Sequence, residues 1–451
     1  MSLLNLLGAL PIPKDIPLPL PLPEWLLVGL LVVSFIVHIL FVNLMLGGTL
    51  LTLFAQVKGL REKEYDQLAH EIAKTITVNK SMAVVMGVAP LLLINTLYTV
   101  YFYSANALTG LFWIAIVPLV TVAFLLTYPH KYLWEKLQNN KGLHISMIAA
   151  ASAMFLCIPL IFLTNINLML YPEKWGTVTG FFSAMALPNV FPRYFHFVFA
   201  SLTVTGLFLF WYFGREGYPF DRKFQVLTRY DIRKRMYSLA FMATLMQFVA
   251  GPLVLLTLPS KAISWSLIAL LAPAVALGIL TLVWLWRGVS GPAENIGRHF
   301  RKVVVTLTLV VALMVSGRHV IRENALGPHK ALVKARTAEY EQLVSAAQTE
   351  LAAQAAKGKD AKPAAGDAGL IASGRAVFET NCVGCHALKT KVVGPPVTEM
   401  ATLYKSKEAA LAQWIKKPGK KRPGYPQMPG FEASIQGKDL EALVLYLLSV
   451  K

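Results

Sequence analysis

The sequence predicts an all-α fold: a polytopic bundle of about eight transmembrane helices with both termini outside, plus a small soluble α-helical domain. Three observations predict it. Of the 451 residues, 55% are hydrophobic and only 15% are charged, with a mean hydropathy of +0.54, whereas soluble domains carry about 25% charged residues. The apolar residues form long blocks. The last 80 or so residues (from about residue 370) return to an ordinary polar composition, so we expect them to lie in water.

The chain begins with a Pro-rich N-terminal segment, residues 1–24, whose Pro/Leu alternation from Pro17 to Pro23 predicts an extended backbone. A membrane domain is expected over residues 25–322. It contains eight apolar segments that are long enough, or nearly so, to cross a hydrocarbon core of ~30 Å. We place these segments at about 25–57, 82–104, 111–128, 145–170, 192–213, 236–258, 264–287 and 302–321.

The loops predict the orientation of the bundle. Lysines and arginines gather after the first, third, fifth and seventh apolar segments, and the alternate loops hold little beyond Lys174, Arg193 and Lys261. Basic loops stay in the cytoplasm, so both termini are expected outside. The same rule accounts for the net charge of +19. We therefore expect the lipid bilayer, and not a nucleic acid, as the partner of these basic residues.

Beyond a helical and Ala/Lys/Pro-rich linker (323–369), the C-terminal domain (370–451) contains Cys382-Val-Gly-Cys385-His386. Two cysteines two residues apart and an adjacent histidine form the attachment motif of one covalent haem c. Cys382 and Cys385 would form the thioethers and His386 would ligate the iron. A zinc site needs further Cys or His ligands, which this domain lacks, and a thioredoxin-like motif needs a βαβ unit.

A methionine is expected as the sixth iron ligand, because His/Met ligation favours electron transfer. Met428 is favoured by its Pro-flanked loop, and Met400 is the alternative. Haem c is attached only on the outer face of the bacterial membrane, in agreement with the predicted orientation. We therefore expect a multi-pass protein of the bacterial inner (cytoplasmic) membrane with this domain in the periplasm or outside. Its many lysines favour a periplasmic redox carrier or another acidic redox partner.

Three histidines lie within or at the ends of the apolar segments, where an ionisable residue indicates function. His38, His196 and His319 are predicted ligands of one or more b-type haems; His319 has the alternative of being solvated or pairing with a propionate. Nearby arginines are predicted to hold haem propionates: Arg193, Arg318 and Arg322. The remaining histidines that border the basic loops are expected to be ordinary polar helix ends: His130, His144 and His299.

The membrane domain resembles subunit I of the cytochrome bd oxidases. The resemblance rests on His38-Ile-Leu-Phe-Val-Asn-Leu-Met-Leu-Gly47, on Arg193-Tyr-Phe-His196-Phe-Val with Thr203-Val-Thr-Gly206, and on Gly317-Arg318. It implies that His38 ligates a haem of the oxygen-reducing site, which allows a haem d there, and that His196 ligates the low-spin b haem. It also implies other membrane subunits of a respiratory complex as partners. The C-terminal domain is class I-like, and fused haem c domains occur in branches of this superfamily.

The chain departs from that family where carboxylates are expected: Asn95, the Val117-Pro118 neighbourhood and Val315-Ser316 stand at the family's glutamates. The loop that serves quinol oxidation is reduced to about 259–261. The expected function is a haem b/c redox protein that transfers electrons between periplasmic cytochrome c and membrane b haems, with oxygen reduction as an extension. The alternatives are a low-spin conduit between quinol or a partner enzyme and periplasmic carriers, or a membrane anchor with a docking cytochrome c domain.

Overall fold

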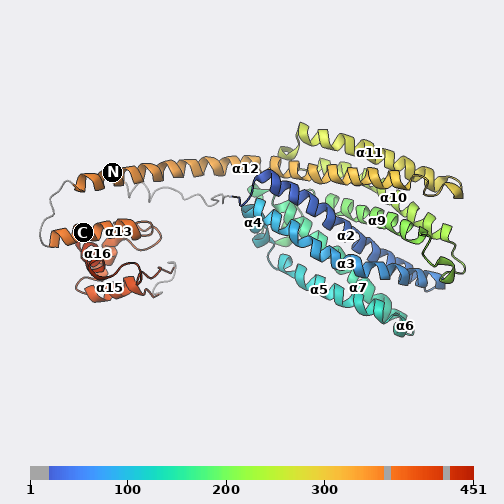
Figure 1. The fold of residues 1–451 in the computed structure, drawn as a ribbon, viewed down its shortest axis with the longest axis horizontal. Coiled ribbons are helices and arrows are strands. Elements are labelled where there is room, and N and C mark those ends of the chain that lie inside the picture. Colours follow the sequence, from blue (N-terminus) through green and yellow to red (C-terminus); the bar gives the residue numbers. More distant parts are fainter. Residues whose placement is uncertain (1–19, 360–366, 420–426, 451) are drawn as a thin grey trace. The chain divides into compact units, whose positions relative to one another are not determined.

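The computed structural model describes residues 20–359, 367–419 and 427–450, and these contain α-helices and short 3-10 turns but no strand (Figure 1). They form two compact units, which divide between Lys330 and Ala331. The first is the membrane unit and the second is the C-terminal unit. Most of the predicted Pro-rich segment (up to residue 19) and part of the predicted linker (360–366) lie outside the described residues.

The membrane unit accounts for the eight predicted crossings, because eight helices in the described part of the chain are long and apolar enough to span a bilayer. The fold-class prediction is confirmed. The spanning helices are α2 (Glu24–Lys58), α3 (Lys63–Leu97), α5 (Leu111–Tyr132), α7 (Lys141–Leu168), α9 (Val190–Gly214), α10 (Arg229–Leu256), α11 (Trp265–Ser290) and α12 (Phe300–Lys359). Three shorter helices connect them: α4 (Thr99–Thr109), α6 (Trp134–Leu137) and α8 (Phe181–Met185).

Two of the spanning helices have boundaries that differ from the prediction. The second spanning helix was expected at 82–104, but α3 begins 19 residues earlier, at Lys63, and ends at Leu97. Its first turns are polar and resemble a loop in sequence, yet they are helical because their carboxylates bond to a neighbouring loop. The last crossing was expected to end near residue 321, but α12 continues well beyond it as one helix.

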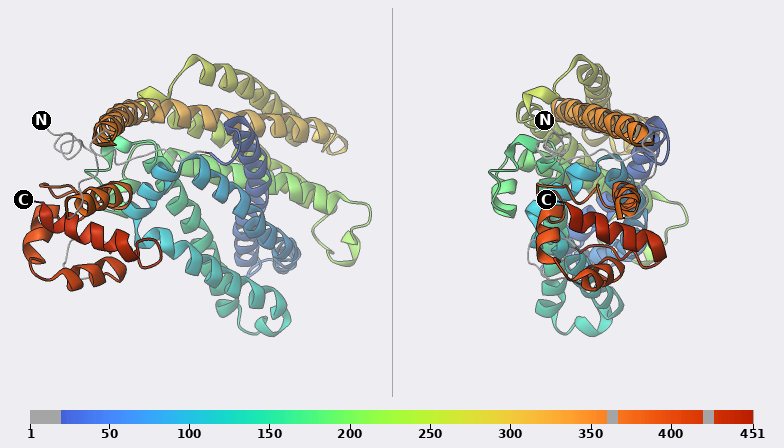
Figure 2. Two further views of the ribbon diagram at one scale, coloured as in Figure 1. Left: turned by 60° about the vertical axis from the view of Figure 1, so that its left-hand side comes forward. Right: turned by 90° about the vertical axis from the view of Figure 1, so that its left-hand side faces the viewer.

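Close backbone contacts hold the central helices together. Helix α2 packs along α3 and also against α9, and α9 packs along α10 (Figure 2). A Cβ at Gly47 of α2 would lie 2.6 Å from the Ser201 carbonyl oxygen of α9. At Gly206 of α9 it would lie 2.7 Å from the Met236 carbonyl oxygen of α10. Small residues therefore set these crossings, as is usual in membrane bundles.

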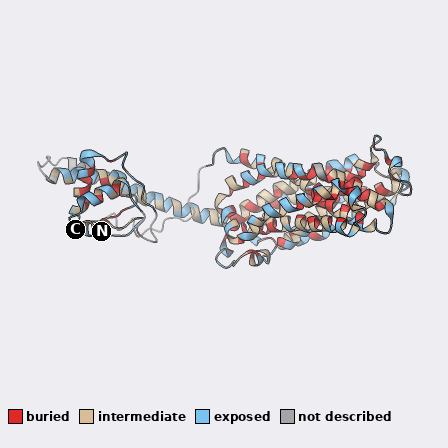
Figure 3. Cartoon of the chain, turned by 90° about the horizontal axis from the view of Figure 1, so that it is seen from below, coloured by how far each residue is buried: buried red, intermediate tan, exposed pale blue. Residues whose placement is uncertain are grey.

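The exposed surface of the membrane unit is apolar. Buried residues follow the inward faces of the helices and exposed residues cover the outside (Figure 3). On α5, for example, Leu111, Ile114 and Val117 are 78%, 66% and 69% exposed. Such a surface is stable against lipid tails, because burying it in the bilayer removes it from water.

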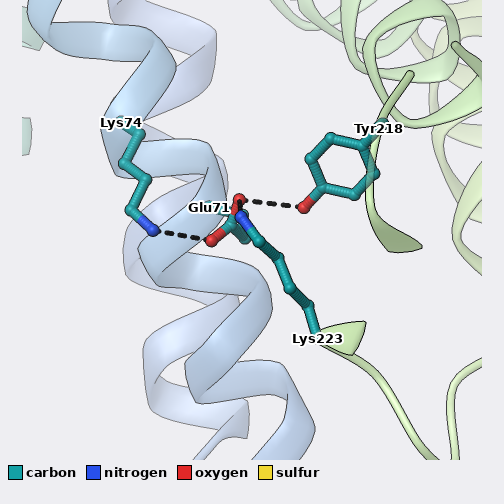
Figure 4. Close-up of polar contacts among 4 residues, drawn as sticks. All are labelled: Glu71, Lys74, Tyr218 and Lys223. Carbon is teal, nitrogen blue, oxygen red and sulfur yellow. Dashed lines mark hydrogen bonds and ion pairs between the residues drawn. The ribbon is translucent and has the colours of Figure 1, made fainter. Parts of the chain in front are cut away.

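The loop between α9 and α10 is fixed to α3 by two carboxylates. Glu71, whose side chain is 1% exposed, forms ion pairs of 2.7 Å with Lys74 and Lys223. It also accepts a hydrogen bond of 2.9 Å from the Tyr218 hydroxyl (Figure 4). Burial, followed by the adjacent Glu71 charge, raises the pKa of Tyr218, so the phenol remains a donor. About two turns earlier on α3, Glu64 accepts hydrogen bonds from the backbone amides of residues 225–227.

The C-terminal unit contains the end of α12 and four helices around a core of its own: α13 (Asp367–Asn381), α14 (Val397–Leu403), α15 (Glu408–Lys416) and α16 (Gly437–Ser449). Helices α13 and α16 pack together, and a Cβ at Gly374 would collide with the Ala442 backbone. One turn on, Phe378 contacts Tyr446 with 5.5 Å between ring centroids. This crossing positions the segment that follows α13.

Replacement of Glu71 by alanine should destabilise the membrane unit by about 3 kcal/mol, because Lys223 and Lys74 lose the buried charge that they share. The matched control is Glu62→Ala, which removes an exposed ion pair with Lys58 and should leave stability unchanged. Thermal unfolding in detergent, with trypsin cleavage at Arg222 and Lys223 as a second readout, measures the difference. Equal stability of the two variants would contradict this role of Glu71.

Candidate haem sites

The Cys-Val-Gly-Cys-His segment is a single turn that continues from the end of α13. The amide of Cys382 bonds to the Phe378 carbonyl oxygen (2.8 Å), and the amide of His386 bonds to the Cys382 carbonyl oxygen (3.0 Å). Cys382 is half-buried, Cys385 is exposed, and His386 is 8% exposed. The motif therefore presents two thiols and an imidazole from one rigid element.

The His386 imidazole is oriented by a carbonyl group, as in haem-ligating histidines. Its Nδ1 lies 2.8 Å from the Pro395 carbonyl oxygen. A carbonyl only accepts, so Nδ1 carries the proton and Nε2 keeps the lone pair that an iron needs. The chain comes so close here that a Cβ at Gly394 would collide with the ring. The residues present fit a covalent haem c.

The thiol environment argues against a redox dithiol. Burial, with a smaller effect from Cys385, raises the pKa of the Cys382 thiol to about 11. Thiol–disulfide exchange requires a thiolate, which low-pKa cysteines supply near neutral pH. The raised pKa of Cys382 instead keeps its thiol protonated near neutral pH.

The two methionine candidates occupy different surroundings. Met400, on α14, packs against the hydrophobic core of the C-terminal unit. Met428 is half-buried in the stretch that follows residues 420–426, which lie outside the described part of the chain, and it does not belong to that core. Met400 already has a packing role in the core, whereas Met428 does not. This difference favours Met428 as the iron ligand, and the assignment stays a prediction.

Three arginines gather near His196 without a carboxylate. Arg193 and Arg322 are each 6% exposed. The guanidinium of Arg193 is close enough to Arg318 and Arg322 for electrostatic repulsion, and Arg193 and Arg318 interact electrostatically with the His196 ring. Among the described residues, none of these arginines forms an ion pair; Arg318 lies over the Phe35 ring (5.0 Å) and Arg322 over the Tyr98 ring (4.7 Å).

This arrangement is costly unless an anion completes it. Like charges repel strongly in a low-dielectric interior, and buried cations in proteins are normally paired. In addition, Nδ1 of His196 is buried and has no hydrogen-bond partner. A haem would supply two propionates to the arginines and an iron to the imidazole, so the donor set fits a b-type haem between α9 and α12. No group of three or more His, Cys, Asp or Glu in the described residues is arranged for a bare metal ion.

His319 belongs to a different group of residues. Its Nδ1 lies 3.2 Å from the Tyr98 hydroxyl, which donates to Glu323 at 2.6 Å, and Lys330 pairs with the same carboxylate at 2.6 Å. No hydrogen bond or ring contact joins His319 to His196 in the described part of the chain. Sequence reasoning missed Glu323, although it lies four residues after His319 and so on the same face of α12.

His38 is held between α2 and α3. Its Nδ1 lies 2.9 Å from the Ala83 carbonyl oxygen, which fixes the proton on Nδ1 and leaves Nε2 free. The ring fits against α3 because residue 87 is glycine: a Cβ at this position would lie 2.8 Å from His38 Cε1. His38 thus meets the same chemical condition for iron ligation as His386.

Two histidines expected to be ordinary polar ends are fully buried. His130 is 1% exposed and His144 is 0% exposed, and both lie against Trp134. That expectation was wrong, because the short helix α6 folds back and covers them. His299, in contrast, stays at the end of the bundle, stacked on Trp284 at 6.3 Å.

Comparisons with known proteins agree with both halves of this description. Residues 369–447 match the family model described as cytochrome C oxidase, cbb3-type, subunit III. Over 74% of this chain and 98% of the other, the fold is similar to that of the bd oxidase from Geobacillus thermodenitrificans, with a TM-score of 0.54 and 14% identity. The chain combines a membrane domain of the bd oxidase fold with a cytochrome c-type domain. No curated protein sequence matches it significantly.

Replacement of Met428 by alanine in the full chain should abolish the long-wavelength absorption band that a methionine ligand gives to oxidised haem c, because Met428 is the expected sixth ligand. Met400→Ala is the matched control, and it should lower stability through a lost core contact while the band persists. Optical spectra of the oxidised protein measure both. A band lost in Met400→Ala and retained in Met428→Ala would reverse the assignment.

Proposed function

We propose that the chain is a haem b/c redox subunit of a bd-like respiratory complex, which transfers electrons between a periplasmic c-type cytochrome and b haem in the membrane domain. The observation that carries the proposal is the unpaired group Arg193, Arg318 and Arg322 beside the unpartnered His196. A membrane anchor would gain nothing from such a group. A haem would supply one-electron redox chemistry at each site when bound.

The residues divide into three roles. Cys382 and Cys385 would attach the haem c covalently, and His386 would hold its iron in the orientation that Pro395 fixes. His196 would ligate the b haem while Arg193, Arg318 and Arg322 neutralise its propionates. The buried guanidiniums would also raise the affinity of the site for an electron, because positive charge stabilises the reduced state.

The cytochrome domain has the charge expected for docking a redox carrier. Its described lysines include Lys389, Lys405, Lys407, Lys416 and Lys417; Lys420 and Lys421 lie outside the described residues. A lysine-rich face steers an acidic partner into a short-lived complex. We propose a periplasmic redox carrier of acidic surface as the partner, and other membrane subunits of the complex at the apolar flanks of the bundle.

Oxygen reduction is the second candidate function, and His38 favours it. Its imidazole is fixed by Ala83 and leaves Nε2 for an iron, and no second histidine contacts it in the described residues. An iron held by His38 alone would keep a position open for a ligand. In the low-spin conduit, any iron held by His38 would need a second ligand from the protein.

Replacement of His196 by alanine should remove one extractable b haem and leave the covalent haem c at full occupancy, because the two sites lie in separate units. Arg193→Gln should reduce b haem occupancy as well, and His299→Ala is the matched control at the opposite end of the bundle. Acid–acetone extraction followed by pyridine haemochrome spectra measures both haems. Full b haem content in His196→Ala would contradict the assignment.

Carbon monoxide distinguishes the two candidate functions. If His38 holds an iron with an open position, the reduced protein should bind carbon monoxide at a b or d haem, and His38→Ala should abolish the spectral change. His196→Ala should retain it. A reduced spectrum that carbon monoxide leaves unchanged would exclude oxygen reduction by this chain and leave the conduit.

A further inference from the structure

A second group of buried polar residues lies where the basic loops end, far along the helices from His196. Three histidines from three helices surround Trp134: His70 of α3 stacks on it at 4.4 Å, His130 of α5 meets it edge-on at 5.2 Å, and His144 of α7 meets it edge-on at 4.4 Å. We call these residues the histidine cluster. The rings of His130 and His144 are also 4.4 Å apart.

The hydrogen bonds define the protonation of His144. Its Nε2 lies 2.9 Å from the His130 carbonyl oxygen, which can only accept, so Nε2 carries a proton. Its Nδ1 is buried without a partner, so in the neutral ring this nitrogen offers a free lone pair. His130 is held through Nε2 by the Gln56 side-chain oxygen at 2.9 Å. The cluster thus contains a buried proton acceptor.

Lys80 lies further along α3 than His70 and has no carboxylate partner in the described residues. It is 1% exposed, its Nζ donates to the Thr127 hydroxyl at 2.6 Å, and it lies 3.3 Å from the centroid of the Tyr128 ring. Thr127 precedes His130 by three residues on α5, which is one turn or about 5 Å. On α3, Lys80 precedes Ala83, whose carbonyl holds His38, by the same spacing. Lys80 therefore lies between the cluster and His38.

A packing role alone does not explain these residues. A buried nitrogen without a hydrogen-bond partner destabilises the fold, and a buried cation without a carboxylate does so more strongly. Leucine or methionine would fill the same space without that cost. Further buried polar atoms without partners lie nearby, on Ser152 of α7 and on Gln56 of α2. Polar atoms of this kind take internal water as partners, and water can link neighbouring acceptors into a chain.

We propose that the histidine cluster and Lys80 form a route by which protons pass from the side of the basic loops toward His38. A proton from bulk water binds Nδ1 of His144, and the resulting imidazolium returns to neutrality by releasing a proton inward. The Lys80 ammonium, which Thr127 and Tyr128 stabilise, first releases a proton toward His38, and the amine that remains then accepts the proton from His144 and becomes an ammonium again. Each donor recovers its lone pair when it passes the proton on. The proton neutralises the negative charge of the electron that the reductant delivers to the membrane domain.

The charged and titratable surroundings agree with uptake from this side. The charged groups that face the cluster lie on α3, on α7 and in the loop before α10: Asp66, Glu71, Lys74, Lys141 and Lys223. Lys131 on α5 faces Lys80. Lys141 pairs with Asp66 at 2.6 Å at the outer edge of the cluster. The proton carriers of this route are imidazoles and an amine, because no carboxylate in the described residues pairs with Lys80 or with Nδ1 of His144. It rests on the proposed function, because protons are needed only if electrons enter the membrane domain.

The test measures proton uptake during reduction of the purified full chain. Stopped-flow mixing with hexaammineruthenium(II) in weakly buffered detergent, with a pH-indicator dye, follows protons and b haem reduction together. His144→Gln keeps the donor to His130 and loses the titratable ring, and Lys80→Gln keeps the bond to Thr127. Each should slow proton uptake at least tenfold at unchanged haem content. Lys80→His, which can titrate, should restore part of the rate, and His299→Gln should match the parent.

The outcomes separate this route from the proposed function. Wild-type rates of uptake in both glutamine variants, with normal b haem reduction, would overturn the route and leave electron transfer standing. Absence of proton uptake by the parent protein upon b haem reduction would do the same. A parent protein without reducible b haem would overturn the proposed function and the route with it. If Lys80→Gln fails to fold, His144→Gln and Lys80→His decide the question alone.

Discussion

The membrane domain depends on how it compensates positive charge that it buries without carboxylates. Arg193, Arg318 and Arg322 share one region, and Lys80 occupies another. In a bilayer, each uncompensated charge costs several kcal/mol. In the proposed account, the two propionates of a haem would neutralise the arginines, and Lys80 would avoid a permanent charge by releasing its proton. Binding of a haem would then stabilise the bundle, because the empty domain retains the repulsion between the arginines.

The two units meet different physical demands. The C-terminal unit needs only local geometry, since one turn after α13 and the Pro395 carbonyl arrange every ligand on the proximal side. The candidate sites of the membrane unit instead combine residues of separate helices, α9 with α12 and α2 with α3. Gly47 and Gly206 allow α2, α9 and α10 to approach one another closely. Sheltered redox groups in such a bundle lie in a medium of low dielectric, which tunes their potential.

The sequence predicted what depends on local pattern. Apolar block length gave the eight crossings, and the spacing of Cys382, Cys385 and His386 gave the haem c motif. It could not predict the start of α3 at Lys63, because Glu64 and Glu71 owe their helical setting to a loop some 150–160 residues away. The burial of His130 and His144 was missed for the same reason: only the folded chain brings α3, α5 and α7 together around Trp134. The Tyr98–His319 contact likewise joins residues 221 positions apart.

The central claim is that one chain carries a covalent haem in its C-terminal unit and an extractable haem in its membrane unit. The most direct measurement is the haem content of the purified full chain before and after acid–acetone extraction, with reduced-minus-oxidised spectra of both fractions. We predict one haem c that remains with the protein and at least one haem b in the extract. A protein whose haem is entirely covalent would contradict the account, and the arginines near His196 would then need another anion.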